Sequence, residues 1–391
     1  MNAEDPELLI PEVLGLLQEV LEVSGQQLLA SEAALRHRDE GIVWLRSVVA
    51  RRDTTIAGLR RRLNTDLPLQ HSSPPDQPDV PPPAATARMD YAEKLAIESR
   101  KWGGHLQLEA SGVWHSWLCQ PIVLANYQHR NRIENLAWPE WARKVLGGPA
   151  RRSLDLGCGS GGTSLKMHAM GATLRVEGFD ISEARIAEAE RRRIAAGIDG
   201  RFCVSDVNHK ALPASTYDLI VSKESFHHFI AVENIMEQVH QALTPDGLFI
   251  LEEFVGPTQF QWTNLQMLLA QAQLARLPER LRILAWGALK NEEGRPTPAI
   301  VEAESPFESI RSAEIVSLFQ KYFDVVAIRK LGGTIQQLLY NGIAHNFRLD
   351  DEEAVQQVKS LCALENLLVD RDIIPSDFML LIGRRRKENA R

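Results

Sequence analysis

The stretch from residue 153 to residue 167, SLDLGCGSGGTSLKM, constrains the fold of this chain more than any other. Ser153 to Leu156 is a short, mainly apolar run that carries one carboxylate, Asp155. Four glycines follow within six residues, and helix-compatible residues continue to Met170. Glycine permits positive φ and lets a ligand approach the backbone closely. The stretch therefore predicts a strand, a glycine-rich turn and a helix, with a ligand lying against the turn.

The spacing of Gly157, Gly159 and Gly162 matches G-x-G-x-x-G, a pattern typical of dinucleotide-binding turns. Asp155 argues against a dinucleotide, because a carboxylate two residues before the first glycine would repel a pyrophosphate. It suits a ligand with a cationic amino group. Asp180 ends the next apolar segment, about where an acid binds ribose hydroxyls in such folds. A dinucleotide oxidoreductase remains as an alternative.

Five motifs occur in order over about residues 140 to 255: DLGCGSG at 155–161, GFDIS at 178–182, CVSD at 203–206, YDLIVS at 217–222 and LTPDGLFI at 243–250. With these motifs the chain resembles the class I S-adenosylmethionine-dependent methyltransferases. The resemblance implies a Rossmann-like α/β fold, in which a seven-stranded, mainly parallel sheet carries helices on both faces. It also implies S-adenosyl-L-methionine as the cofactor.

Short apolar runs alternate with helical stretches after the glycine turn, which indicates a mainly parallel sheet. Strands are expected at 201–205, 218–222, 248–252 and 378–383, and a helix at 181–197 with Ser182 as its N-cap. Ligands of such sheets lie beyond the carboxyl ends of the strands. The polar residues at those ends are Asp155, Asp180, Asp206 and Ser222.

The resemblance assigns roles to these residues. Asp155 would face the amino acid moiety of the cofactor, directly or through water, and Asp180 would accept from both ribose hydroxyls. Asp206 would accept from the adenine amine, with an N-cap or turn acid as the alternative role. The complete expected cofactor-binding set is Asp155, Gly157, Gly159, Gly161, Asp180, Ile181, Asp206, Val207 and Ser222.

A general base is needed only if the methyl acceptor must lose a proton. His227 and His228 follow the fourth expected strand, and an imidazole titrates near neutrality. They could instead only pack or orient the loop. Glu252 is a rival base that could equally pair with an arginine. The four cysteines are scattered, so no metal site is expected.

The chain has 391 residues, enough for two or three domains. Apolar residues recur every seven positions from Leu14 to Leu63, which predicts an oligomerising coiled coil over residues 1–63 or, alternatively, a helical hairpin. Residues 64–87 are a Pro-rich linker. The methyltransferase-like domain at 88–391 would comprise a helical cap (88–148), a cofactor-binding core (149–255), a helical insertion (256–310) and the last part of the sheet (311–391).

The acceptor is suggested by a narrower resemblance. Motifs such as EEFVGPTQFQW at 252–262 and ESRKWGGH at 98–105 resemble a bacterial methyltransferase group associated with cell-surface polysaccharide or other glycan assembly. An O-methyltransferase for a glycan or glycosylated acceptor is therefore expected, with Trp262 and the upstream tryptophans stacking on sugars or closing the core. A small-molecule or lipid-quinone-like methyltransferase and a non-catalytic scaffold are the alternatives.

The net charge of −7 argues against nucleic acid as a partner. No run of about 18 apolar residues occurs, so no membrane span is expected. The acidic N-terminus lacks a signal pattern, and the expected location is cytoplasmic.

Overall fold

The structure, a computed structural model, describes residues 89–111 and 116–386, with only the backbone for residues 106–111. The expected coiled coil and Pro-rich linker lie outside the described residues and stay predictions. Within the described part, no helix has the length and apolar character needed to cross a membrane.

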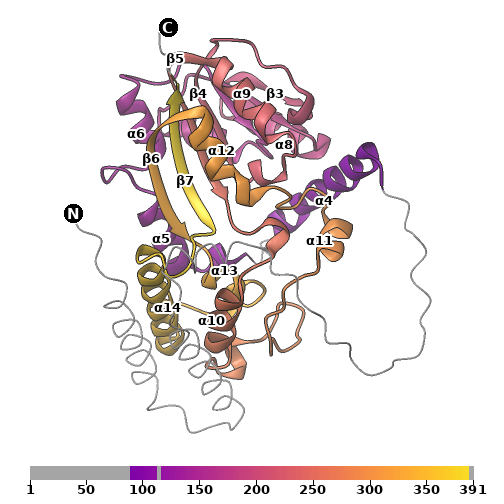
Figure 1. Ribbon diagram of the computed structural model, residues 1–391, viewed down its shortest axis with the longest axis vertical. Helices are drawn as coiled ribbons and strands as arrows, with labels where there is room; N and C mark the ends of the chain where they lie inside the picture. The colour runs from indigo at the N-terminus through magenta and orange to yellow at the C-terminus, as the bar shows by residue number, and fades with distance from the viewer. Residues whose placement is uncertain (1–88, 112–115, 387–391) are drawn as a thin grey trace, which may run out of the picture. The chain divides into compact units, whose positions relative to one another are not determined.

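One sheet organises the described residues (Figure 1). Its strands are β1 (Ser153–Leu156), β2 (Arg175–Asp180), β3 (Asp199–Val204), β4 (Tyr217–Lys223), β5 (Leu243–Phe254), β6 (Phe323–Gly332) and β7 (Phe378–Arg385). Their order is β3-β2-β1-β4-β5-β7-β6, with β7 antiparallel to both neighbours and the other pairs parallel. The predicted seven-stranded, mainly parallel sheet is confirmed.

The helices either connect these strands or lie beside one end of the sheet. They are α4 (Tyr91–Ser111), α5 (Pro121–Arg130), α6 (Trp138–Val145), α7 (Gly162–Ala169), α8 (Glu183–Ala195), α9 (Val232–Ala242), α10 (Asn264–Leu274), α11 (Pro298–Glu304), α12 (Ile315–Tyr322), α13 (Ile335–Tyr340) and α14 (Glu352–Asp370). Short 3-10 turns are η2 (Trp117–Cys119), η3 (Val207–His209), η4 (Phe226–His228), η5 (Thr258–Phe260), η6 (Glu279–Leu281), η7 (Ser312–Glu314) and η8 (Ala344–Asn346).

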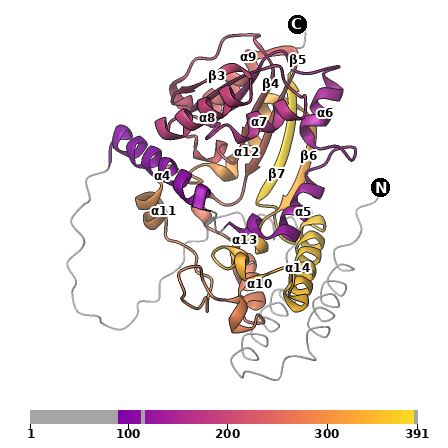
Figure 2. The same cartoon turned by 180° about the vertical axis from the view of Figure 1, so that it is seen from behind.

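Successive side chains of each strand point to opposite faces of the sheet, so the hydrophobic core is divided between these two faces. Leu219 and Val221 of β4 belong to one buried cluster, with residues of α5, α6 and α7, and Ile220 belongs to another, with residues of α9 and α12. A continuous apolar run along a strand therefore serves both clusters. Figure 1 shows α9 and α12 on the face of the sheet toward the viewer. Figure 2, seen from behind, shows α7 and α8 on the opposite face.

The helical insertion and the later helices form a separate group beside the sheet. Helices α10, α13 and α14 lie together at one end of the sheet in both views (Figures 1 and 2). Trp262 is buried here with 7% of its surface exposed, and its Nε1 donates to Asp377 Oδ2 at 2.9 Å. Trp138 and Trp141 are buried in the same cluster. These three tryptophans close the core, which is the second of the two roles considered from the sequence.

Most helix and strand ends expected from the sequence lie within two residues of the ends in the structure. Helix α8 begins after Ser182, whose Oγ accepts from Arg185 N, as predicted. Strand β5 is irregular near its start, since Tyr217 pairs with Leu243 but Leu219 pairs with Leu248. Helix α12 begins without a side-chain cap.

Candidate functional site

A cavity of about 310 Å³ lies beyond the carboxyl ends of β1, β2, β3 and β4. Its wall combines the glycine turn, the residues after β2 and β3, the loop after β4, and three side chains of α4, Leu95, Glu98 and Trp102. Helix α4 therefore forms part of the cavity wall. Parallel strands end at a common edge of the sheet, which brings these separate segments together.

The glycine turn forms the floor of the cavity. Gly157 has φ +69°, and a Cβ at this position would lie 2.5 Å from the side chain of Ser225. Gly161 has φ +79° but does not line the cavity; a Cβ there would come within 3.3 Å of Ala189 on α8. Gly157 thus permits close packing of the turn against the loop after β4, whereas Gly161 permits close packing against α8.

Asp180 ends β2 and lines the cavity, and Ile181 lies beside it. Its Oδ2 accepts from Gly159 N at 2.9 Å and its Oδ1 from Ser182 N at 2.8 Å. Burial raises the pKa of Asp180, and these two backbone hydrogen bonds oppose the rise. Each carboxylate oxygen has a second lone pair, so the group can still accept hydrogen bonds from a diol.

Asp206 and Val207 line the cavity after β3. Asp206 Oδ1 accepts from Asn208 N at 2.9 Å and caps η3, and Oδ2 accepts from the hydroxyl of Tyr91 on α4 at 2.5 Å. Burial and the neighbouring Asp206 raise the pKa of Tyr91. The N-cap role considered from the sequence is therefore real, and it leaves Asp206 on the cavity wall.

Asp155 and Ser222 are not among the residues that line the cavity. Asp155 is 1% exposed, and its Oδ2 accepts from Ser164 Oγ at 2.6 Å. Burial raises the pKa of Asp155 to about 7, against the lowering effect of the Ser164 hydrogen bond. Ser222 Oγ donates to the carbonyl of Leu156 at 2.9 Å. Both side chains have partners in the interior, so of the two modes expected for Asp155 the contact through water fits better, and the cofactor role of Ser222 stays a prediction.

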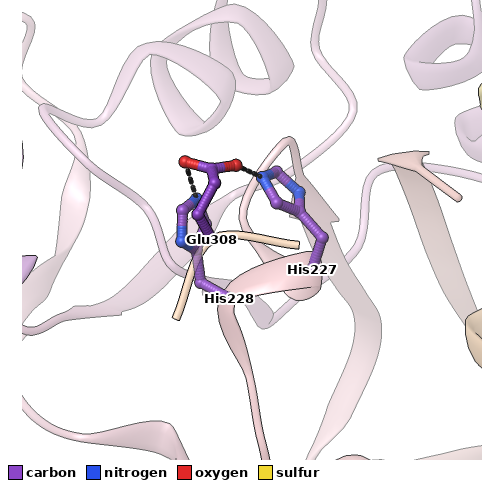
Figure 3. Close-up of side chains that lie close together, drawn as sticks. All are labelled: His227, His228 and Glu308. Carbon is purple, nitrogen blue, oxygen red and sulfur yellow. Dashed lines mark ion pairs between the residues drawn. The ribbon is translucent and has the colours of Figure 1, made fainter. Parts of the chain in front are cut away.

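Five titratable side chains form what we call the acid–histidine cluster: Glu98, His227, His228, Glu253 and Glu308. Glu98 and His228 line the cavity. His227 Nδ1 lies 2.5 Å from Glu253 Oε1, and its Nε2 lies 3.4 Å from Glu308 Oε1. Figure 3 shows the carboxylate of Glu308 between the two imidazoles, with one oxygen toward each ring.

Charges within the cluster shift the pKa values of His227 and Glu308. Burial alone would lower the pKa of His227, but Glu253 and Glu308 outweigh it and raise the pKa to about 10. Burial likewise raises the pKa of Glu308, and the two histidines outweigh it and hold the pKa well below its usual range. Carboxylates therefore face both ring nitrogens of His227, whereas the base role expected for either histidine stays a prediction. His228 reaches the cavity.

Glu252 is unsuited to act as a base. It is 3% exposed, lies 2.5 Å from Lys223 Nζ, and accepts from Trp138 Nε1 at 2.8 Å. Burial raises the pKa of Glu252, but the ammonium of Lys223 outweighs it and lowers the pKa. The ion-pairing alternative therefore describes Glu252, with lysine in place of arginine.

The sequence interpretation assigned no role to Tyr91, Glu98 or Glu308. Glu98 is 1% exposed, and its carboxylate accepts from Trp102 Nε1, Ser305 Oγ and Phe307 N. These bonds attach the loop after α11 to α4. Glu308 stands in that loop with no motif around it, so its position beside the histidines follows only from the fold.

The cavity residues fit a nucleoside. Gly157, Gly159 and Gly162 line the cavity without side chains, and two carboxylates occupy the ends of adjacent strands on the cavity wall. This arrangement defines an α/β domain of the nucleoside-binding kind, with the ligand across the strand ends.

Comparison with known proteins specifies the domain. Residues 149–296 match a family model described as a methyltransferase domain. The 27-O-demethylrifamycin SV methyltransferase of Amycolatopsis mediterranei is 31% identical over 106 residues, which are 27% of this chain and 39% of that protein. The demethylmenaquinone methyltransferase of Thermus thermophilus is 27% identical over 140 residues, 34% of this chain and 64% of that protein. The chain thus spans less than two thirds of either relative.

Solved structures give weaker likenesses. An S-adenosylmethionine-dependent methyltransferase from Mesorhizobium loti has a TM-score of 0.35 and 18% identity, covering 63% of this chain and 98% of that one. The geranyl diphosphate C-methyltransferase of Streptomyces coelicolor has a TM-score of 0.41 and 15% identity, covering 64% and 79%. The family match and the sequence relatives, rather than these structures, show that residues 149–296 are similar to methyltransferase domains.

Proposed function

We propose that the protein transfers a methyl group from S-adenosylmethionine to a hydroxyl of a glycan or a glycosylated acceptor. The observation that carries the methyl-transfer part is the single cavity that joins the glycine turn, Asp180, Asp206 and the loop after β4. In this arrangement Asp180 accepts from the ribose hydroxyls, Asp206 and Val207 contact the adenine, and the backbone of Gly157 and Gly159 lies under the amino acid moiety. Asp155, in the interior, acts on that moiety only through water or through the turn.

The bound cofactor supplies an electrophilic methyl group. The protein has to place the acceptor oxygen in line with it and exclude water. Leu95, Phe229 and Phe307 provide apolar wall for that purpose, and His228 and Glu98 provide the polar groups nearest to the loop after β4. As the new C–O bond forms, the C–S bond breaks with its electron pair on sulfur, and the acceptor proton leaves to a base or to water.

The glycan part is supported by the motif resemblance and by the size of the cavity. A volume of about 310 Å³ is at the lower end for a small-ligand pocket. A cofactor would fill most of it, which places the acceptor at the opening and suits a group presented on a larger molecule. Among the described aromatic residues of the cap, Trp102 lines the cavity and could contact such an acceptor.

A second candidate is a small-molecule or quinone-like acceptor. It is favoured by the relatives, whose names refer to a rifamycin and to demethylmenaquinone. A non-catalytic scaffold is the third. We further propose that residues 1–63 join copies of the chain into an oligomer, and that the protein acts in the cytoplasm.

Two measurements test the proposal. Calorimetry with S-adenosylmethionine should show one binding site per chain, and absence of binding would favour the scaffold. A labelled methyl donor should then transfer label to a polysaccharide or glycolipid pool. Transfer to a quinone or small-molecule pool instead would overturn the glycan acceptor while leaving the methyl transfer intact.

A further inference from the structure

The acid–histidine cluster is assembled from four separate segments of the chain. Glu98 comes from α4, the two histidines from η4, Glu253 from the end of β5, and Glu308 from the loop after α11. All five side chains are buried or nearly so; His228, the most exposed, has 12% of its side chain accessible. Burial of so many ionisable groups is costly unless they are paired or bind a cation.

The two imidazoles present the same nitrogen to Glu308. A carboxylate lies beside Nδ1 of each ring: Glu253 at 2.5 Å from His227, and Glu98 at 2.9 Å from His228, the second contact being an ion pair not aligned as a hydrogen bond. The Nε2 atoms face Glu308 at 3.4 and 3.9 Å (Figure 3). Metal-binding histidines commonly direct one nitrogen at the metal and the other at a carboxylate or carbonyl.

The charge of the cluster is compatible with a bound divalent cation. Three carboxylates stand here, and the ammonium that contacts them is Lys101 Nζ, 3.8 Å from Glu308 Oε2. Two further positive charges are therefore needed, which two imidazole protons or one divalent cation would supply. One potential ligand atom from each of His227, His228 and Glu308 lies within 4.8 Å of the others. A central ion with bonds of about 2.0–2.2 Å would require shifts of less than about 1 Å.

We propose that Nε2 of His227, Nε2 of His228 and a carboxylate oxygen of Glu308 bind a divalent transition-metal cation. Glu253 and Glu98 orient the two imidazoles from behind. Two nitrogens and one oxygen suit Zn²⁺, Mn²⁺ or Fe²⁺ better than Ca²⁺ or Mg²⁺, which prefer oxygen ligands. Three protein ligands leave coordination positions open, and since His228 and Glu98 line the cavity, an open position is directed toward the acceptor end of the site.

The metal site has a role that rests on the proposed methyl transfer. An acceptor hydroxyl at an open position would bind through its oxygen, and the cation would lower the pKa of the hydroxyl as it does for bound water. The proton passes to water, and the oxygen then forms the bond to the methyl carbon. This assigns the acidification of the acceptor to the cation, because His227 and Glu252 are both held in ion pairs.

Metal binding is tested on the full-length chain without an affinity tag, after treatment with a chelator. Titration with Co²⁺ should produce visible absorption bands of nitrogen-ligated cobalt that saturate at one ion per chain, and Zn²⁺ should displace it. Elemental analysis after gel filtration should give one Zn²⁺ per chain. Neither measurement needs a variant, so a chain that shows no saturable cobalt bands and no retained zinc overturns the site.

Variants locate the ion. Glu308→Gln and His228→Gln should each weaken Zn²⁺ binding at least tenfold, a loss typical of removing a ligand or its support. Glu304→Gln and His129→Gln, which replace exposed residues of the same types, should bind like the unaltered chain. Equal binding by all four variants would place the ion elsewhere and overturn the proposal. Circular dichroism verifies that each variant is folded.

A last comparison separates the metal site from the methyl transfer. Calorimetry with S-adenosylmethionine is performed on the metal-free and the Zn²⁺-loaded chain, and transfer of labelled methyl is measured in both. Metal binding without any transfer would count against the proposed function and leave the site intact. The expected result is that removing the metal abolishes methyl transfer while cofactor binding is retained. Equal transfer in the metal-free and loaded chains would overturn the role of the metal in acidifying the acceptor.

Discussion

The ends of β1, β2 and β3 and the acid–histidine cluster both concentrate charge at one edge of the sheet, but they are built differently. At the strand ends each acid sits on a short local motif, and the motif determines where it lies. In the cluster, Glu98 and Glu308 meet two histidines from a third segment, through contacts between residues far apart in the chain. Local patterns therefore find the cofactor end of the site, and only the fold reveals the other end.

The largest expected effect tests whether the cluster supports the structure. Glu253 is fully buried and accepts hydrogen bonds from Ser225 N and Phe226 N besides its pair with His227. Glu253→Ala should lower the free energy of unfolding by about 3–5 kcal/mol, because a buried charge and two amides lose their partner. Urea unfolding measures this.

A matched control is Glu302→Ala, which removes a partly exposed ion pair with Lys94. That change should cost at most about 1 kcal/mol. If the two variants lose similar stability, the cluster is no more tightly packed than the surface, and the contrast between the two regions fails.

The fold was largely predictable because its signals are local. The strand expected at 218–222 spans Tyr217–Lys223, and the helix expected at 181–197 spans Glu183–Ala195. The errors concern burial and partners. Trp262 has a sequence context that suits a sugar platform, but its Nε1 donates to the buried Asp377, which also accepts from Gln266 of α10. Nothing near Glu308 in the sequence marks it, because the two histidines that it faces lie 80 or more residues away.

The next prediction separates the acid that faces the interior from those that face the cavity. The pKa of Asp155 is about 7 in the folded chain, raised by burial and opposed by Ser164. Its unfolded value is about 3.9, so the folded chain binds this proton more tightly. The stabilisation from that proton is complete below about pH 4 and is lost as the pH rises through about 7.

Asp155→Asn removes this pH dependence while keeping an acceptor for Ser164 Oγ. As the pH rises from about 5 to about 8, the free energy of unfolding of the unaltered chain should fall, on the order of 2 kcal/mol relative to that of the variant. Urea unfolding at both pH values measures the difference. A difference independent of pH would show that Asp155 is ionised throughout, and that it belongs with the cavity acids after all.

A smaller effect is expected for the acid on the cavity wall. Asp180→Ala should weaken S-adenosylmethionine binding by about 1–3 kcal/mol, because the ribose hydroxyls lose their acceptor. Calorimetry measures the affinity. The control is Asp218→Ala. Asp218 lies near the start of β4, where its carboxylate accepts from Arg151 N, and this variant should bind the cofactor normally. Unchanged affinity in Asp180→Ala would remove the main support for the cofactor orientation.

The smallest expected change in cofactor affinity is that of a Tyr91 variant. Tyr91 joins a residue of a local motif, Asp206, to a distant segment of the chain. Asp206 belongs to a local motif, but the hydroxyl of Tyr91, 115 residues away, holds its Oδ2 at 2.5 Å. Because both oxygens of Asp206 have partners from the protein, the carboxylate is fixed in one orientation before a ligand arrives. Tyr91→Phe frees Oδ2 to rotate and should weaken cofactor binding by about 0.5–1.5 kcal/mol, the usual net value of one hydrogen bond.

The direction of this change decides between two uses of Asp206. Weaker binding means that the carboxylate must be positioned by α4 to accept from the adenine amine, so even the predictable end of the site depends on a contact that the sequence does not show. Tighter binding means that Tyr91 competes with the adenine for the same oxygen. An unchanged affinity, measured by calorimetry beside Asp206→Asn, would assign Asp206 to capping η3 alone and would leave Asp180 as the acid that recognises the nucleoside.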